Sequence, residues 1–285
     1  MTQVQKPAQD RVWLITGCSS GLGQALAEAV LARGERVVAT ARNRQQVEPF
    51  AARYPGRALA LSLDVTRGDS ITQAVEDTLA HMGRIDVLVN NAGYGIVGAV
   101  EEVDGAEVRQ IFETNVHGLL KMTSAVLPHM RGRRSGHILN ISSMGGLVAL
   151  AGFGIYSATK FAVEGLSEAL AGELKPLGIR VTIVEPGPFR THFRGGLAIA
   201  ARTIADYDAT VGPVRKTVTG AGGALQPGDP ALAAAVMIAA VDAPSPPLRL
   251  PLGQICHDQI KGKLASLDED IAAWRHLSIP TAFQA

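Results

Sequence analysis

The segment VWLITGCSSGLG, residues 12–23, joins a short apolar run to a glycine-rich turn that leads straight into a stretch with helical spacing. From Thr16 to Gly23 the order is T-G-x-x-x-G-x-G. In a strand-to-helix turn, glycines let backbone amides approach a pyrophosphate, whose charge is stabilised by the N-terminal end of the helix dipole. Taken alone the motif also fits a turn without a ligand. Its place after the first strand favours a nucleotide-binding turn made by Gly17, Ser19, Ser20, Gly21, Leu22 and Gly23.

The same alternation of apolar runs and helical stretches continues along the chain. Runs rich in Val, Ile and Leu without polar alternation predict strands buried on both faces, at 12–16, 37–41, 58–63, 87–90, 137–142, 181–184 and 248–252. Helical spacing fills 22–32, 45–53, 70–81, 106–130, 156–176 and 230–241. Strands alternating with helices predict an α/β fold with a doubly wound parallel sheet flanked by helices. No linker interrupts the pattern before about residue 190, so residues 1–285 are expected to form a single domain.

Charge and composition exclude several classes of function. With 27 Lys and Arg against 26 Asp and Glu, the net charge of +1 argues against a nucleic-acid binder. The 47% of apolar residues favours a sizeable core. The longest uncharged apolar runs have about half of the roughly 20 residues that a spanning helix needs, and no secretory signal is visible. Two cysteines suit a reducing compartment, so a cytoplasmic protein without a membrane or nucleic-acid partner is expected.

One long segment, residues 190–229, breaks the alternation. It combines an apolar, Ala-rich part with many glycines. Long irregular segments in compact domains are usually functional, so this one is expected to be a substrate lid; the alternative is a solvated insertion. Residues 195–285 carry no recognisable motif and are expected to decide specificity.

The end of the second predicted strand discriminates between cofactors. A ribose 2′-hydroxyl is held by an acidic residue about 20 positions past the glycines, whereas a 2′-phosphate is held by a cation. No Asp or Glu occurs from Arg36 to Val47, and Arg42 ends the strand with Arg44 close behind. A guanidinium can bind phosphate through two hydrogen bonds. NADP(H) is therefore preferred over NAD(H), unless Arg42 is simply solvated.

Ser143, Tyr156 and Lys160 form a second informative pattern. Lys160 follows Tyr156 by four residues, so both share one helix face, and the ammonium is expected to lower the phenol's pKa from its ordinary value of about 10. Tyr156 would then exchange a proton with a carbonyl or alcohol oxygen. Ser143, at the end of the 137–142 strand, would hydrogen-bond the same oxygen. A bare Y-x-x-x-K equally fits a solvated pair on a helix, so the combination carries the weight.

Together these motifs make residues 11–191 resemble the short-chain dehydrogenase/reductase family, which implies a Rossmann-type fold and hydride transfer to or from a carbonyl carbon, with Tyr156 as acid/base. Several further residues match the family pattern, and no catalytic position departs from it. By similarity, Asp64 and Val65 would contact adenine, and Asn91, Ala92 and Gly93 would line the adenosine ribose region. Lys160 would also bind the nicotinamide ribose, and Asn115 would hold a water in a proton relay to it. Pro186, Gly187 and Thr191 would hold the nicotinamide end. Without the resemblance, these polar residues could be caps or turn residues.

The expected substrate is an apolar ketone, aldehyde or secondary alcohol, because residues 144–159 hold no charge. The flanking residues expected in this fold are Tyr94, Ile96, Val97, Leu147, Val148 and Phe153. Arg190, His192 and Arg194 keep an anion clamp open as an alternative. An NADP(H)-binding sensor without turnover is the competing function, although such a protein has no need of the intact catalytic set. The resemblance also implies a homodimer or homotetramer packed through the 106–130 and 156–176 helices. No metal site is expected, since the histidines lack ligand spacing.

Overall fold

The central sheet of this computed structural model, which describes residues 10–219 and 226–283, has seven parallel strands in the order β3-β2-β1-β4-β6-β7-β9. Each strand coincides with one predicted apolar run. Their bounds are β1 (Val12–Ile15), β2 (Arg36–Ala41), β3 (Ala58–Ser62), β4 (Val87–Asn90), β6 (Gly136–Ile141), β7 (Ile179–Pro186) and β9 (Arg249–Leu252). The strand order reverses between β1 and β4. In open α/β sheets, ligands bind in the crevice at the carboxyl ends of the strands at such a point.

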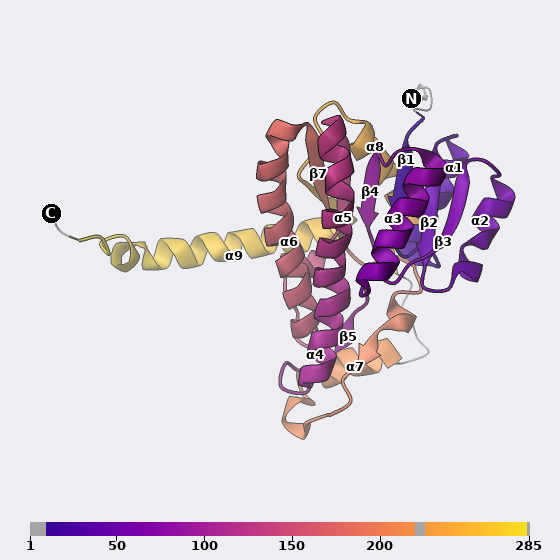
Figure 1. The fold of residues 1–285 in the computed structure, drawn as a ribbon. Coiled ribbons are helices and arrows are strands. Elements are labelled where there is room, and N and C mark those ends of the chain that lie inside the picture. The colour runs from indigo at the N-terminus through magenta and orange to yellow at the C-terminus, as the bar shows by residue number, and fades with distance from the viewer. Residues whose placement is uncertain (1–9, 220–225, 284–285) are drawn as a thin grey trace.

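Helices cover both faces of this sheet (Figure 1). α1 (Gly21–Ala32), α2 (Glu48–Arg53) and α8 (Pro230–Asp242) share one hydrophobic core with the sheet, and α3 (Gly68–Met82), α5 (Gly118–Arg133) and α6 (Gly154–Leu174) share the other. Along β1, Trp13 and Ile15 enter the first core while Val12 and Leu14 enter the second. Because both faces are buried, the strands appear in the sequence as continuous apolar runs. The predicted doubly wound fold is confirmed.

The helix predicted over 106–130 is divided in three. It begins as α4 (Gly105–Phe112), passes through a π-helical turn at Glu113–His117 and continues as α5. Asp104 and Glu107 form a capping box that starts α4. A π-turn inserts one residue into the helical ladder and is frequent at functional sites. Here it contains Asn115, one of the residues expected to be catalytic.

The segment expected to be a lid is held by a second, two-stranded parallel sheet. β5 (Ile96–Val97) pairs with β8 (Ala198–Ile199), and α7 (Gly212–Thr219) follows. Two glycines flank β5: a Cβ on Gly95 would lie 2.4 Å from Leu197, and one on Gly98 would lie 2.6 Å from Ala200. Strands of two residues give no periodic signal, so the sequence analysis did not include them. Residues 220–225 of the expected lid lie outside the described part of the chain.

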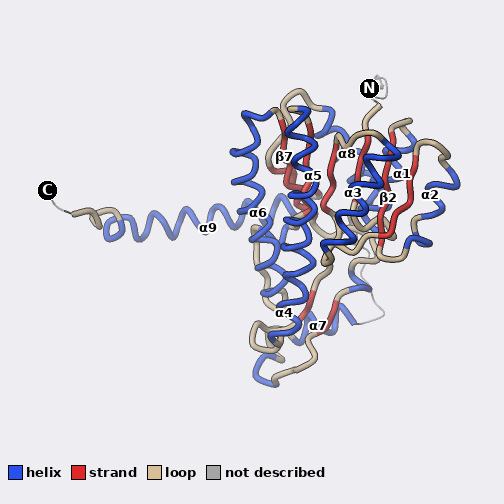
Figure 2. Tube along the Cα trace, viewed as in Figure 1, coloured by secondary structure: helices blue, strands red, loops and turns tan. Residues whose placement is uncertain are grey.

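A long C-terminal helix, α9 (Gln254–Ser278), was also not predicted. It leaves the body beside α6 and projects away from it (Figures 1 and 2). Its first turn is anchored by Cys256, which is fully buried and donates to the carbonyl of Glu185 at 3.0 Å. Within the described residues, no helix is long and apolar enough to cross a bilayer.

Candidate active site

A cleft of about 1400 Å³ opens at the carboxyl ends of the central strands. It holds more than the 300–1,000 Å³ of an ordinary small-molecule pocket, which leaves room for a dinucleotide beside a substrate. Its lining includes nearly every residue that the sequence analysis assigned to cofactor or catalysis, namely Gly17, Ser19, Ser20, Gly21, Leu22, Arg42, Asp64, Val65, Asn91, Ala92, Gly93, Ser143, Tyr156, Lys160, Pro186, Gly187 and Thr191. The fold therefore brings residues from seven segments of the chain to one site.

The glycine turn is shaped to receive a phosphate. Gly17 and Gly21 have φ values of 72° and 65°, which side-chain-bearing residues rarely adopt. A Cβ on Gly23 would lie 2.5 Å from the carbonyl oxygen of Gly17, so α1 can approach the turn this closely only with glycine there. Ser20, at the N-cap of α1, makes no side-chain cap hydrogen bond. The first amides of α1 are thus left for a ligand, and the turn fits the pyrophosphate of a dinucleotide.

Asn91 fixes this turn to the end of β4. Its Nδ2 donates to the carbonyl oxygens of Thr16 at 2.8 Å and Gly17 at 2.9 Å. In return, Thr16 Oγ1 accepts from the backbone amides of Asn91 and Ala92, both at 2.9 Å. The side-chain amide of Asn91 therefore positions the glycine turn. Because this amide is already bonded, the expected contact with the adenosine ribose would have to be made by other atoms of residues 91–93.

Arg42 and Asp64 lie together in the part of the cleft that is expected to hold the adenosine. Asp64 Oδ1 accepts from the Thr66 amide at 2.9 Å and from its hydroxyl at 2.7 Å. Burial raises the pKa of Asp64, but these bonds and the charge of Arg42 outweigh it and lower the pKa. Arg44, the second cation expected here, is bonded to Glu48 at 2.9 Å. Of these two cations, Arg42 lines the cleft and Arg44 does not.

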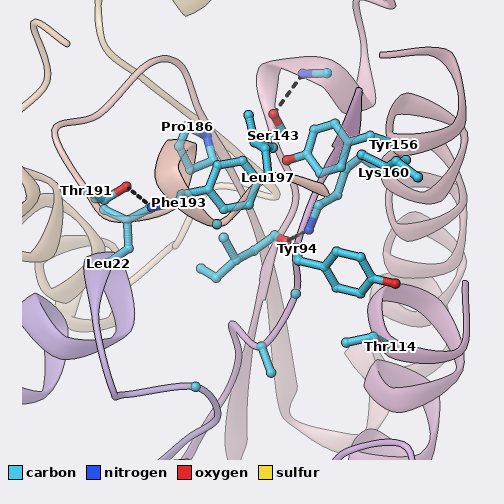
Figure 3. Close-up of a pocket in the computed structure, with 18 of the residues that line it drawn as sticks. Leu22, Tyr94, Thr114, Ser143, Tyr156, Lys160, Pro186, Thr191, Phe193 and Leu197 are labelled. Carbon is cyan, nitrogen blue, oxygen red and sulfur yellow. Dashed lines mark hydrogen bonds between the residues drawn. The ribbon is translucent and has the colours of Figure 1, made fainter. Parts of the chain in front are cut away.

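The three residues expected to be catalytic, Ser143, Tyr156 and Lys160, come together in the cleft. Figure 3 shows the oxygens of Ser143 and Tyr156 directed toward one another, with Lys160 below the phenol. Lys160 Nζ lies 5.9 Å from the Tyr156 ring centroid and donates to the carbonyl of Ile141 at 2.8 Å. Ser143 Oγ accepts from the amide of Gly145 at 3.0 Å. This places one hydroxyl, one phenol and one ammonium along a single wall.

The protonation of Tyr156 differs from the sequence prediction. Burial raises its pKa to about 12, and a hydrogen bond with Ser143 opposes the shift. Burial likewise lowers the pKa of Lys160 to about 8, while the charge of Glu164 opposes that shift. The prediction of a lowered phenol pKa is wrong for the protein without ligands, because desolvation of the buried ring exceeds any effect of an ammonium that is bonded to Ile141. Tyr156 is a neutral acid in this state.

Asn115 lies behind this wall, buried at the π-turn. Its Oδ1 accepts from the Tyr94 amide at 3.1 Å, and its Nδ2 donates to the Tyr94 carbonyl at 2.9 Å and to Thr159 at 3.1 Å. A Cβ on Gly93 would lie 3.0 Å from Asn115 Oδ1 and 3.8 Å from Lys160 Nζ. Asn115 therefore adjoins Lys160, and its side chain holds the loop after β4.

The residues expected at the nicotinamide end lie at the end of β7 and in the loop after it. Gly187 donates to the carbonyl of Leu252 at 3.0 Å, which ties this loop to β9. The Thr191 side chain would lie 3.5 Å from a Cβ on Gly21, and its Oγ1 accepts from Phe193 at 3.3 Å. The base of the lid thus meets the glycine turn across the cleft, as Figure 3 shows for Thr191 and Leu22.

Apolar side chains close the cleft around Tyr156. Of the six residues expected there, Tyr94, Ile96, Val148 and Phe153 line it. Val97 and Leu147 are not part of the lining; Val97 is fully buried in β5 instead. Phe193 was not predicted to line the cleft, and its ring centroid lies 5.9 Å from that of Tyr156. Other apolar lining residues that were not predicted are Leu150, Leu197, Pro213, Val214, Val218 and Ile255.

The alternative of an anion clamp gains no such geometry. His192 lines the cleft, whereas Arg190 is exposed and outside the lining, and the Arg194 side chain is outside what the structure describes. Two carboxylates, Glu107 and Glu113, also stand in the lining. They disfavour an anionic ligand there.

Comparison with known proteins identifies the family. Residues 11–200 match the family described as short chain dehydrogenase. Oxidoreductase BOA17 of Botryotinia fuckeliana (strain B05.10) is 36% identical over 95% of this chain and 99% of that protein. A 3-ketodihydrosphingosine reductase of Bacteroides thetaiotaomicron is 44% identical over 70% of this chain and 72% of that protein. A short-chain dehydrogenase from Streptomyces avermitilis superposes with a TM-score of 0.90 at 48% identity, covering 96% of this chain and all of that one.

The fold and the site define a nucleotide-dependent oxidoreductase that acts on CH–OH and C=O groups. The chain belongs to the short-chain dehydrogenase family. A solved 3-ketoacyl-(acyl-carrier-protein) reductase from Brucella melitensis, 28% identical with a TM-score of 0.73 over 86% of this chain and 97% of that one, is complexed with NADH.

Proposed function

We propose that this protein is an NADP(H)-dependent carbonyl reductase for bulky apolar ketones or aldehydes, with Tyr156 as the general acid. The observation that carries the proposal is a neutral, buried phenol next to Ser143, facing an apolar wall at the end of a nucleotide cleft. When bound, the dinucleotide supplies the hydride for the carbonyl carbon. The glycine turn, Asp64, residues 91–93 and residues 186–191 would hold it.

Tyr156 supplies the proton in this proposal. Ser143 donates a hydrogen bond to the substrate oxygen and so polarises the C=O bond. Tyr156 then gives its hydroxyl proton to that oxygen, which leaves an alcohol and a phenolate. Lys160, charged below its pKa of about 8, stabilises the phenolate until a proton returns through Asn115 and bound water. The raised pKa of Tyr156 favours reduction, because the acid is fully protonated at neutral pH.

Arg42 supports the preference for NADP(H). It lines the adenosine end of the cleft, and no acidic residue lies between Arg36 and Val47 to accept from a 2′-hydroxyl. A guanidinium at this position would bind a 2′-phosphate in two-pronged fashion.

The apolar wall supports a large hydrophobic substrate. Phe193 and Leu197 of the 190–229 segment line the cleft together with Phe153 and Val148, and the carboxylates Glu107 and Glu113 are in the same lining. The name of one relative, 3-ketodihydrosphingosine reductase, is in keeping with a ketone substrate. A long or bulky ketone is therefore the first substrate class to try.

Two further expectations belong to this proposal. The protein is expected to form a homodimer or homotetramer through the faces of α5 and α6, which expose Leu120 and Phe161. It is expected to act in the cytoplasm.

Burial raises the pKa of Cys18 to about 12 and that of Cys256 to about 11, so neither thiol is a reactive redox centre.

The test is NADPH consumption by the purified protein against ketones and aldehydes of increasing chain length, with Tyr156→Phe as the paired variant. Turnover by the wild-type chain and a loss of at least about a thousandfold in Tyr156→Phe are expected, because the proton donor is gone. NADH at equal concentration is the cofactor control. Tight NADPH binding without turnover across the panel would instead favour the sensor that binds NADP(H) without catalysis.

A further inference from the structure

The helix α9 has no covering on any side along most of its length. From Lys261 to Ser278 every residue is exposed, and the helix runs about 27 Å past the body over these residues. A lone helix of this length is marginal in water, because most helical stability in proteins comes from packing of an apolar face. α9 therefore needs a surface to pack on.

The apolar residues of α9 form one continuous stripe, the α9 seam. Its members are spaced four, three, four and three residues apart: Ile260, Leu264, Leu267, Ile271 and Trp274. This is the spacing of a coiled-coil face. Leu264 is 60% exposed and Trp274 is 65% exposed. A continuous exposed apolar stripe of this kind is typical of an interaction surface.

The charges beside the seam are complementary to those of a second, antiparallel copy of the same helix. Lys261 and Asp268 flank it on one side, and Lys263 and Asp270 flank it on the other. When two such helices pack antiparallel, like sides meet, so each lysine lies near the aspartate of the same side on the second helix. The basic half of α9 then faces the acidic half of its copy.

We propose that α9 is a dimerisation arm whose seam packs antiparallel against the seam of a second copy of this chain. The two-fold axis passes between residues 265 and 266, so residue i faces residue 531 − i of the partner. Leu264 then opposes the partner's Leu267, and Ile260 opposes the partner's Ile271. Such an isologous contact is self-complementary and closes at two chains.

This register also explains apolar residues beyond the seam. Leu277 comes level with the partner's Gln254, where α9 leaves the body, since 531 − 277 = 254. Ile279 and Phe283, which are both strongly exposed, follow Leu277 and would lie against the body of the second copy. There, Ile255 at the root of α9 lines the substrate cleft. An antiparallel pair keeps the two bodies at opposite ends of the arms.

A membrane surface is the other candidate occupant, and the charges disfavour it. Lys261, Lys263 and Arg275 are outnumbered by Asp258, Asp268, Glu269 and Asp270, so the helix is net acidic. Interfacial helices attract anionic lipid through a polar face rich in Lys and Arg.

The first experiment compares masses of the full chain by light scattering at a fixed concentration. Leu264→Glu/Leu267→Glu is expected to halve the mass of the wild-type assembly. Ser266→Glu/Ala273→Glu adds the same charge on the opposite face of α9 and is expected to leave the mass unchanged. Unaltered thermal melting of the body would show that both variants fold. Equal masses for the seam variant and the wild-type chain would overturn the proposal.

A charge exchange tests the pairing. Lys261→Asp/Lys263→Asp makes all four flanking positions acidic, and Asp268→Lys/Asp270→Lys makes them all basic. Each variant alone is expected to have half the wild-type mass, and an equimolar mixture is expected to regain it. Failure of the mixture to regain mass would refute the charge pairing.

Two further measurements test whether the paired helices are antiparallel and whether the seam binds a second copy or a membrane. A mixture of Leu264→Cys and Leu267→Cys chains is expected to form a mixed disulfide, whereas preferential self-linking of Leu264→Cys would indicate a parallel pair and refute the register. Cosedimentation with phosphatidylcholine and phosphatidylserine vesicles is expected to be absent. Binding to the vesicles that Leu264→Glu/Leu267→Glu abolishes would assign the seam to a membrane instead.

Discussion

Replacing Gly23 by alanine tests whether the glycine turn owes its shape to close backbone approach. The new Cβ would lie 2.5 Å from the Gly17 carbonyl oxygen and 2.4 Å from Asn91 Nδ2, so the backbone and the side chain that secure the turn must both move. Overpacking of this kind costs about 1–3 kcal/mol. Losing the two hydrogen bonds from Asn91 costs about 0.5–1.5 kcal/mol each.

Together these terms predict a loss of about 2–6 kcal/mol in the free energy of unfolding. For a chain of this size the melting temperature would fall by roughly 5–15 °C. The dissociation constant for NADPH, measured by isothermal titration calorimetry, is expected to rise at least about tenfold, because the amides of α1 no longer converge on one point.

Gly172→Ala is the matched control. Gly172 lies near the end of α6 with nothing within 4 Å of an added Cβ, so alanine there is expected to stabilise the helix by about 0.5–1 kcal/mol and to leave NADPH binding unchanged. If Gly23→Ala binds NADPH as the wild-type chain does and melts at the same temperature, the close-approach reasoning is refuted.

Three other changes have expected outcomes. Arg42→Asp should lower kcat/KM with NADPH by about 10- to 100-fold and raise it with NADH, since a carboxylate repels the 2′-phosphate and accepts from a 2′-hydroxyl; an unchanged ratio would exclude Arg42 from cofactor choice. Phe193→Ala should raise KM for a bulky ketone by about 10- to 100-fold and spare a small one, whereas His192→Ala should spare both. Burial, with the charge of Glu164, raises the pKa of Glu185 from 4.5 to about 7 against the attraction of Arg249. Because the folded state then holds the proton between pH 4.5 and 7, this carboxyl lowers stability as pH rises through that window. Glu185→Gln should flatten the dependence of the melting temperature on pH between pH 5 and 8 and should raise the melting temperature at pH 8. An unaltered dependence on pH would contradict the raised pKa of Glu185.

The sheet and the site were predictable because their signals are local. Each strand is buried on both faces, so runs such as residues 12–15 are uninterrupted by polar residues. The glycine turn and the spacing of Ser143, Tyr156 and Lys160 lie within single strand-turn-helix units. The family pattern then supplied the order in which these units follow one another.

What the sequence could not reveal depends on contacts between distant segments. The pairing of residues 96–97 with 198–199 joins strands too short for any periodicity. Phe193 and Tyr156 meet beside Gly95, where an added Cβ would lie 3.3 Å from Phe193 and 3.5 Å from Tyr156. The direction of the Tyr156 pKa shift depends on how much of the fold covers the ring. The α9 helix and its seam were not predicted, and the exposure of the seam depends on where β9 releases the chain.

The small sheet of β5 and β8 makes the lid tolerant of sequence change. The amides of Ala198 and Ala200 donate to the carbonyls of Gly95 and Val97, both at 2.9 Å, so main-chain atoms set the height of the lid above the cleft. Side chains such as Phe193 and Leu197 can therefore be exchanged to reshape the substrate wall while the lid keeps its register. For an engineer, the permissive positions are the inward-facing lid side chains, and the forbidden ones are the two glycines on which the ladder rests.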